Sequence, residues 1–417
     1  MNAAASAMTR ERCRELDRTD PLASRRGAFV LDEGRIYLDG NSLGPLTHAA
    51  RRRVQEVLDH EWGRDLIAGW NVHGWIDLPA RLGARIAPLI GATAGDVVVG
   101  DSTSVNLFKL AASFMRDAAP RTRIVTELGN FPTDLYVLEG LADLMPGRVE
   151  LAAVPRGDVL AAIDGRTAMV VLTHVHYKTA ETYDLPGLTA AAHERGAAVL
   201  WDLSHSVGAL PVDLGSARAD LAVGCTYKYL NGGPGAPAFL YVRPDLQARL
   251  EPAIAGWLGH EAPFAFDDDY RPAAGVARHL AGTPGILGMA ALDGSLEVFD
   301  QLDLAALRAK SLALTDLFIG LVESRCAAHG LELVTPREPA RRGSHVSFSH
   351  PEGYGIIQAL VARGVTGDFR APDVLRFGFT PLYTRHVDVW DAVDALVAVL
   401  DGREWSRAEH RRRRPVT

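Results

Sequence analysis

The chain has 417 residues, which is too long for one small core, so two domains or one large domain with an appendage are expected. Its formal charge of −7 argues against nucleic-acid binding, and its apolar content of 47% is that of a soluble globular protein.

The three cysteines, Cys13, Cys225 and Cys326, are scattered along the chain. They form neither a disulfide framework nor a zinc-binding pattern, which favours a reducing compartment. The first residues, MNAAASAMTRERC, contain no apolar run typical of a signal peptide, and no segment approaches the ~18 apolar residues of a membrane span. We therefore expect a cytoplasmic protein without membrane contact.

The stretch GDSTSVNLFKLAASFM (100–115) predicts a loop that opens into a helix. Asp101, Ser102, Thr103 and Ser104 are all residue types that cap helix N-termini. Free amides at such an end bind anions, phosphate above all, although a plain N-cap explains the pattern equally well.

Short apolar segments alternate with helical ones through the middle of the chain. The predicted strands are 123–128, 167–175, 197–205, 219–227 and 237–243, and a clear helical stretch is 185–196. Near-continuous apolar strands separated by helices predict a mostly parallel sheet with helices on both faces.

The pattern changes near residue 300. A long helical stretch ends at Gly330, a short strand follows at 344–350, and a last helix at 387–402 closes the chain. We expect an N-terminal segment (1–60) that packs with the small domain, a large domain (61–299) and a small C-terminal α+β domain (300–417).

Polar residues follow several predicted strands at their carboxyl ends, where doubly wound sheets bind ligands. These residues are Thr173, Asp202, Ser204, His205, Tyr227 and Lys228. Pyridoxal phosphate needs an amine for a Schiff base, an acid at its pyridine nitrogen and backbone donors for its phosphate. A lysine such as Lys228 is by itself typical of a surface, but with Asp202 and Ser104 it predicts this cofactor.

Several motifs lie between YLDGNSLGPL (37–46) and RFGFTPLYTRHVDV (376–389). They include DSTSVNLF, NFPTD, LTHVHYKTAE, WDLSHSVGALPVDL, CTYKYLNGGPG, GWLGH and GTPGIL. Together they make the chain similar to the kynureninases of bacterial type. The resemblance implies a fold-type-I pyridoxal-phosphate enzyme with a mostly parallel seven-stranded sheet, helices on both faces and a smaller C-terminal α+β domain.

The resemblance also implies which residues contact the cofactor. Lys228 would form the Schiff base, Phe131 would stack on the ring, and Asp134 and Asp202 would lie near the pyridine nitrogen. The remaining expected contacts within the subunit are Thr103, Ser104 and Tyr227 at the phosphate, Thr173 along the ring and His205 at the phenolic oxygen. Trp257 and Thr283 match positions that reach the cofactor of the neighbouring subunit, which implies a homodimer with shared sites.

The implied reaction is the hydrolytic cleavage of L-kynurenine between Cβ and Cγ to anthranilate and L-alanine, a step of tryptophan catabolism. Lys228 would remove the α-proton, Tyr227 is our candidate proton shuttle, and Asp202 completes the expected catalytic set. Arg376 matches the arginine that holds the substrate α-carboxylate, because a guanidinium can bind a carboxylate bidentately.

Three positions bear on specificity. Trp70, Gly282 and Thr283 stand where animal-type enzymes of this family, which favour 3-hydroxykynurenine, carry histidine, serine and asparagine. These residues offer fewer partners to a substrate hydroxyl, so we expect a preference for kynurenine.

Three other functions remain open. A cysteine desulfurase or selenocysteine lyase needs a cysteine on a mobile loop, but Cys326 lies in a helical pattern. An aminotransferase shares the fold, and a non-enzymatic binding protein would have lost the lysine, the aspartate or the arginine. His174 and His176 lack a recognisable third ligand, so no metal site is expected.

Overall fold

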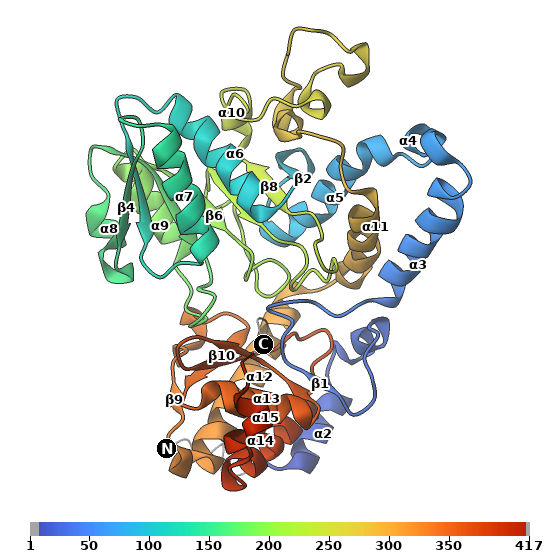
Figure 1. Cartoon of the computed structure of the whole chain (residues 1–417), viewed down its shortest axis with the longest axis vertical. Coiled ribbons are helices and arrows are strands. Elements are labelled where there is room, and N and C mark those ends of the chain that lie inside the picture. Colours follow the sequence, from blue (N-terminus) through green and yellow to red (C-terminus); the bar gives the residue numbers. More distant parts are fainter. Residues whose placement is uncertain (1–7, 414–417) are drawn as a thin grey trace.

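Seven short apolar segments pair into one sheet in the computed structural model, which describes residues 8–413 (Figure 1). The strands lie in the order β2 (Val97–Val99), β8 (Phe239–Val242), β7 (Leu221–Gly224), β6 (Ala198–Asp202), β5 (Thr167–Thr173), β3 (Arg123–Glu127) and β4 (Glu150–Val154). Neighbours from β7 to β4 are parallel, whereas β8 is antiparallel to both β2 and β7. The predicted mostly parallel sheet is confirmed.

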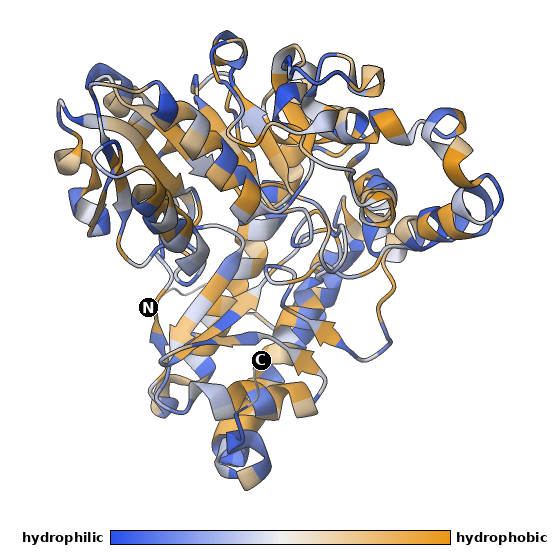
Figure 2. Cartoon of the chain, turned by 45° about the horizontal axis from the view of Figure 1, so that its top comes forward, coloured by the Kyte–Doolittle hydropathy of each residue, from blue (hydrophilic) through white to orange (hydrophobic). Residues whose placement is uncertain are grey.

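Helices cover both faces of this sheet because successive strand residues point to opposite sides. Val170 packs in one core with Leu188, whereas Val171 packs in another core with Leu107 and Leu138. Figure 2 shows these strands coloured as hydrophobic beneath the helices. The helices of this domain are α5 (Leu78–Ile86), α6 (Thr103–Arg116), α7 (Pro132–Leu144), α8 (Val159–Ala162), α9 (Leu185–Glu194), α10 (Pro244–Gln247) and α11 (Ile286–Ser295).

The C-terminal part forms a second, smaller domain around an antiparallel sheet. Its strands lie in the order β12 (Asp368–Arg370), β13 (Val374–Gly378), β10 (His345–Ser349) and β9 (Glu332–Leu333). Phe318 anchors its core, with ring centroids 4.9 Å from Phe377 and 5.0 Å from Phe379. The helices are α12 (Leu304–Arg325), α13 (Gly353–Ala362), α14 (His386–Asp401) and α15 (Ala408–Arg411).

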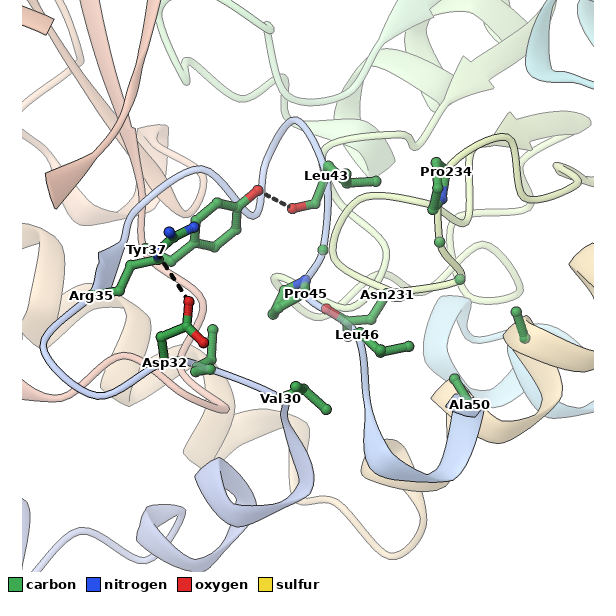
Figure 3. A pocket seen from close by; sticks show the side chains of 15 residues that line it. Val30, Asp32, Arg35, Tyr37, Leu43, Pro45, Leu46, Ala50, Asn231 and Pro234 are labelled. Atoms are coloured by element: carbon green, nitrogen blue, oxygen red, sulfur yellow. Dashed lines mark hydrogen bonds and ion pairs between the residues drawn. The ribbon is translucent and has the colours of Figure 1, made fainter. Parts of the chain in front are cut away.

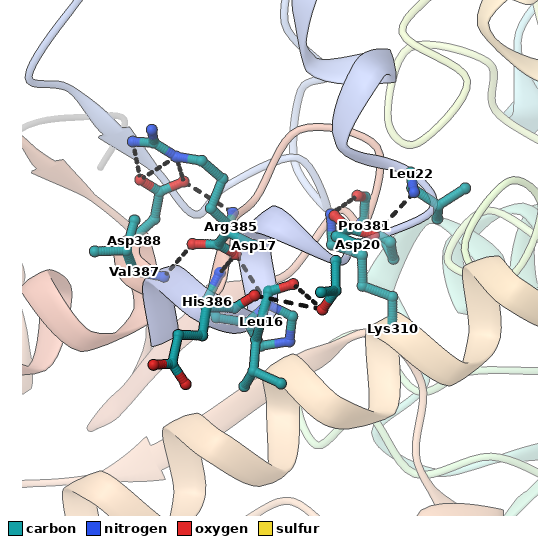
Figure 4. Close-up of polar contacts among 12 residues, drawn as sticks. Leu16, Asp17, Asp20, Leu22, Lys310, Pro381, Arg385, His386, Val387 and Asp388 are labelled. Carbon is teal, nitrogen blue, oxygen red and sulfur yellow. Dashed lines mark hydrogen bonds and ion pairs between the residues drawn. The ribbon is translucent and has the colours of Figure 1, made fainter. Parts of the chain in front are cut away.

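The N-terminal segment joins the two domains. The Asp17 carboxylate, at the end of α2 (Arg10–Arg18), accepts hydrogen bonds from the backbone N–H groups of His386 and Val387 at the start of α14 (Figure 4). Lys310 pairs with Asp20 at 2.6 Å. Further on, β1 (Ile36–Tyr37) pairs with β11 (Val365–Thr366) of the small domain, whereas α3 (His48–Glu56) packs along α11 of the large one. The short α4 (Gly69–Val72) lies at the periphery (Figure 1).

The other predicted elements are present with shifted ends, and the strands of the large sheet are shorter than predicted, for example Ala198–Asp202 in place of 197–205. The strand at 344–350 is β10 and the last helix is α14, but the helix predicted to reach Gly330 ends at Arg325. A 3₁₀ turn follows it, and Gly330 has a φ of 71°, in the left-handed region that stops a helix. The predicted domain limits after residues 60 and 299 stay predictions.

None of the helices between residues 8 and 413 is long and apolar enough to cross a bilayer. The first seven residues, part of the stretch without a signal-peptide pattern, and the last four lie outside the described residues.

Candidate active site

The amine of Lys228 lies just beyond the carboxyl end of β7, beside the ends of β5 and β6. Thr173 and Asp202 end β5 and β6 and are partners in the parallel register. Lys228 is only 8% exposed, and its Nζ lies 3.4 Å from Nδ1 of His205 and 5.8 Å from the ring centroid of Phe131. The strand ends therefore bring an amine, an imidazole, a carboxyl and an aromatic face together.

Two buried aspartates share this edge of the sheet. Thr173 Oγ1 lies 3.1 Å from Asp134 Oδ2, and Asn130 donates to the same oxygen at 3.2 Å. Asp202 Oδ1 accepts the backbone N–H of Ser204 at 2.7 Å. Burial raises the pKa of both Asp134 and Asp202, and the charge of Asp202 raises that of Asp134 further. The pair thus favours a bound proton or a neighbouring cation.

His205 is held as a neutral imidazole. Burial and the charges of Lys228 and Arg376 lower its pKa well below the usual value. Its Nε2 is buried and has no hydrogen-bond partner within residues 8–413. We call the set formed by Asp134, Thr173, Asp202, His205 and Lys228 the large-domain wall.

Tyr227 stands next to the lysine, with its ring centroid 5.8 Å from the Lys228 Nζ. Burial and the neighbouring Cys225 raise the pKa of its phenol, which therefore keeps its proton at neutral pH. Backbone contacts fix this loop, because the N–H of Gly44 donates to the Tyr227 carbonyl at 2.8 Å. A Cβ at Gly44 would collide with the Lys228 carbonyl, so only glycine permits this approach.

A pocket of about 300 Å³ separates the N-terminal segment from the loop after Lys228 (Figure 3). Its lining includes Tyr37, Leu43 and Asn231, and the Tyr37 hydroxyl donates to the Leu43 carbonyl at 2.7 Å. This bond, with that of Gly44, fixes the intervening segment beside Lys228.

Thr103 and Ser104 are the first two residues of α6. The Ser102 hydroxyl caps this helix by accepting the Val105 N–H at 3.3 Å. Both residues are partly exposed, so the end of α6 presents amides and hydroxyls of the kind that bind phosphate. Gly282 and Thr283 lie with Asp101, just before this helix, around a second pocket of about 360 Å³.

The small domain contributes a cluster of charges around Arg376. This arginine is fully buried and donates to Asp368 through Nε at 2.8 Å and through Nη2. It also donates to Ser42 Oγ at 2.7 Å and to the Tyr177 carbonyl at 2.6 Å. The Tyr177 ring packs edge-on against Phe131 at 5.3 Å, so the cluster adjoins the large-domain wall.

Sequence reasoning did not single out the partners of Arg376. Asp368 and Arg370 alternate on β12, so both lie on the face toward Arg376, and Arg370 donates to Asp368 at 2.6 Å. Asp39 and Ser42 come from the N-terminal segment, and the only signal for them was the motif YLDGNSLGPL. We call the set formed by Asp39, Ser42, Asp368, Arg370 and Arg376 the small-domain wall.

The predicted site residues Trp70 and Trp257 also lie outside this cluster in the single chain. Trp70 is in the peripheral α4 and packs edge-on against Trp75 at 6.0 Å (Figure 1). Trp257 packs edge-on against the exposed Phe264 at 5.7 Å, in the loop region between α10 and α11.

The residues present fit pyridoxal phosphate. His205 Nε2 has no hydrogen-bond partner within residues 8–413, and the raised pKa values of Asp134 and Asp202 favour a neighbouring protonated group. The Lys228 amine is buried beside the aromatic face of Phe131. The end of α6 adds donors suited to a phosphate.

Comparisons with known proteins agree with this geometry. A family model described as "Kynureninase C-terminal domain" matches residues 307–396. The kynureninase of Pseudomonas fluorescens is 55% identical over 414 residues, which is 98% of this chain and all of that protein. This chain belongs to the kynureninase family. The kynureninases of Burkholderia pseudomallei and Burkholderia mallei are 53% and 52% identical over the same share of both chains. The cofactor is pyridoxal phosphate.

Solved structures of lower identity show the same fold. A cysteine desulfurase from Thermococcus onnurineus has a TM-score of 0.73 at 19% identity and covers 93% of this chain and 98% of its own. One from Escherichia coli also has a TM-score of 0.73, at 20% identity, covering 91% and 98%. In the kynureninase-family chain, however, Cys326 is buried and its pKa is raised by burial to about 11, which suits no persulfide-forming thiol.

The histidine pair of the kynureninase-family chain is engaged in structural hydrogen bonds. His174 bonds Ser206 at 2.9 Å and His176 bonds the Gly129 carbonyl at 2.9 Å. In the part of the chain that the structure describes, no three histidine, cysteine or acidic residues gather as metal ligands do.

Proposed function

We propose that this chain hydrolyses L-kynurenine between Cβ and Cγ to give anthranilate and L-alanine. The observation that carries the proposal is the position of the buried Lys228 amine, 3.4 Å from His205, between an acid pair and the charged small-domain wall. Full-length relatives at 52–55% identity carry the same activity in their names.

The large-domain wall would hold the cofactor. Lys228 would bond its aldehyde carbon, Asp202 with Asp134 would keep its ring nitrogen protonated, and Phe131 would stack on the ring. Thr103, Ser104 and Tyr227 would bind its phosphate, Thr173 would line the ring and His205 would donate toward the phenolic oxygen. When bound, pyridoxal phosphate supplies an electron sink that stabilises negative charge on substrate carbon.

Lys228 and Tyr227 would move the protons. Lys228, once its amine is free, takes the proton from Cα of the substrate. Tyr227 enters with its phenol protonated because burial and Cys225 raise its pKa, so it can pass a proton to and from the reacting carbonyl. Water adds to the γ-carbonyl carbon, the Cβ–Cγ bond breaks, and Cγ leaves as the carboxyl carbon of anthranilate. Cβ keeps the bonding electrons and receives a proton, and Lys228 returns the proton to Cα, which completes alanine.

The substrate would span both walls. Arg376 orients the α-carboxylate, while Trp70, Gly282 and Thr283 shape the far end around the aromatic ring and favour kynurenine over its 3-hydroxy derivative. Because Trp70 and Trp257 lie outside the single-chain cluster, we propose that a second subunit completes each site.

The proposed homodimer is supported by the exposed aromatic residues Trp257, Phe264 and Phe266. Subunit mixing tests it: Lys228→Ala and Trp257→Ala proteins, each poorly active, should regain activity together because a mixed dimer holds one intact site. Activity of the mixture no higher than that of the two separate variants would argue against shared sites.

The absence of a disulfide pattern among the cysteines supports a cytoplasmic location.

The direct test supplies the cofactor-loaded protein with L-kynurenine and quantifies anthranilate and L-alanine. Equal amounts of both are expected. L-cysteine serves as the competing substrate, and release of sulfide from it without anthranilate formation from kynurenine would assign the desulfurase activity instead.

A further inference from the structure

Arg376 has little capacity left for a ligand. A guanidinium carries five N–H donors. Four of them are used, by Asp368 twice, by Ser42 and by the Tyr177 carbonyl, which leaves one hydrogen on Nη1. Its side chain is 2% exposed, so a bidentate pair with a substrate carboxylate would require Asp368 to leave.

Arg370 has the donors that Arg376 lacks. Its Nη2 donates to Asp368 at 2.6 Å and to Ser42 at 3.2 Å. Its Nε is buried without a partner, and its Nη1 donates to no group within residues 8–413. The side chain is 35% exposed, on the edge strand β12. Both arginines therefore share Asp368 and Ser42 as partners, but only Arg370 combines a partly exposed side chain with several unused donors for a ligand.

Arg370 also faces the large-domain wall. Burial raises the pKa of Tyr177 and of Tyr227, and the charge of Arg370 opposes that rise in both. The same charge helps to lower the pKa of His205, after burial and Lys228. An arginine that acts on these three groups lies toward the space between the two walls.

The small-domain wall carries a net charge of one positive unit at neutral pH. Arg370 and Arg376 oppose the single carboxylate of Asp368, because burial and Asp368 raise the pKa of Asp39 to about 8 and keep it protonated. A partly buried guanidinium charge without a full counter-charge favours an anionic ligand.

We propose that Arg370 binds the α-carboxylate of the substrate together with the one free donor of Arg376, while Asp368 and Ser42 hold the two guanidiniums in place. Arg376 thereby orients Arg370 as well as the ligand. The inference rests on the proposed function only in taking an α-amino acid as the ligand.

The test compares two ligands that differ only in the carboxylate. Binding of L-alanine and of L-alaninamide to the cofactor-loaded protein is measured by titration calorimetry. The wild type should prefer alanine, and Arg370→Gln should reduce that preference by about tenfold, as expected for a lost charge-assisted contact. Arg370→Met, which keeps most of the aliphatic stem, should do the same and serves if the glutamine variant does not fold.

Arg363→Gln is the matched control, because Arg363 is an exposed arginine of the same domain that pairs with Glu404. It should leave both affinities unchanged. An unchanged preference in the Arg370 variants, or an equal loss of both ligands, would overturn the inference and assign Arg370 to structure alone. The wild-type assay with L-kynurenine is separate, so failure of the proposed reaction would be seen without altering this result.

Discussion

The large-domain wall comes from the ends of three neighbouring strands and the first turn of α7, whereas the small-domain wall combines one edge of a second sheet with residues 39–42. Its two arginines and Asp368 reach the site because the domains dock, both through the N-terminal segment and through direct contacts such as the bond from Arg376 to the Tyr177 carbonyl. The first wall suits covalent and proton chemistry, and the second suits recognition of charge. The difference predicts that changes in the first wall affect turnover, and changes in the second affect affinity.

Lys228→Ala tests the first wall and has the largest expected effect. Turnover should fall by roughly 10³-fold or more, because within residues 8–413 Lys228 is the buried lysine that lies beside Asp202. Borohydride reduction followed by mass spectrometry should find no cofactor attached to the chain. Lys178→Ala is the control, since its Nζ lies 5.9 Å from the Tyr177 ring and donates only to a backbone carbonyl. A trapped adduct in the Lys228 variant would place the covalent bond elsewhere.

Arg376→Lys tests the second wall. An ammonium cannot reproduce the paired bonds to Asp368, so KM for L-kynurenine should rise by about tenfold to hundredfold while kcat changes less. Steady-state kinetics give both constants, and Arg363→Lys is the control. An unchanged KM with a lower kcat would contradict the expectation that the small-domain wall sets substrate affinity rather than turnover.

Substrate specificity tests the end of the proposed site that would hold the aromatic ring of the substrate. Wild type should prefer kynurenine over 3-hydroxykynurenine by about tenfold to hundredfold in kcat/KM, since an unpaired hydroxyl costs about 1–3 kcal/mol. The variant combining Trp70→His, Gly282→Ser and Thr283→Asn should narrow or reverse that ratio. If wild type already favours the hydroxylated substrate, these three residues do not set specificity.

Asp39→Asn probes the charge of the small-domain wall and has the smallest expected effect. Burial and Asp368 raise the pKa of Asp39 to about 8, so in the wild type this carboxyl ionises as the pH rises through that value. The added negative charge should weaken carboxylate binding, raising KM by about threefold to tenfold between about pH 7 and about pH 9 relative to the variant. The charged or titratable groups that face Asp39 are Asp368, Arg370, Arg376, Tyr37, Tyr229 and Tyr383.

The same group affects stability. Its folded pKa lies above its unfolded value near 4, so the folded state binds the extra proton and loses stability as the pH rises from about 4 through about 8. Asp39→Asn lacks this loss, and its melting temperature should exceed that of the wild type more at pH 8 than at pH 5. Parallel pH profiles of the two proteins would contradict the assigned pKa.

Most of the large-domain wall was predictable from the sequence because its residues follow apolar strands, and parallel strands end at one edge. Asp134, in α7, was expected only through the resemblance. Thr173, Asp202 and Lys228 needed no knowledge of the other domain. Arg376 was expected only through the resemblance, and Asp39, Ser42, Asp368 and Arg370 were missed. Their neighbours are set by domain docking, which local patterns of hydrophobicity do not encode. Trp70 and Trp257 were expected from the resemblance, and in the single chain they pack against Trp75 and Phe264 instead.

The most direct test of the account is the fate of water oxygen. The cofactor-loaded protein is given L-kynurenine in water enriched in the heavy oxygen isotope, and both products are examined by mass spectrometry. Hydrolytic cleavage predicts one heavy oxygen in the carboxylate of anthranilate and none gained by L-alanine. Unlabelled anthranilate, or a keto acid in place of alanine, would contradict the proposed reaction.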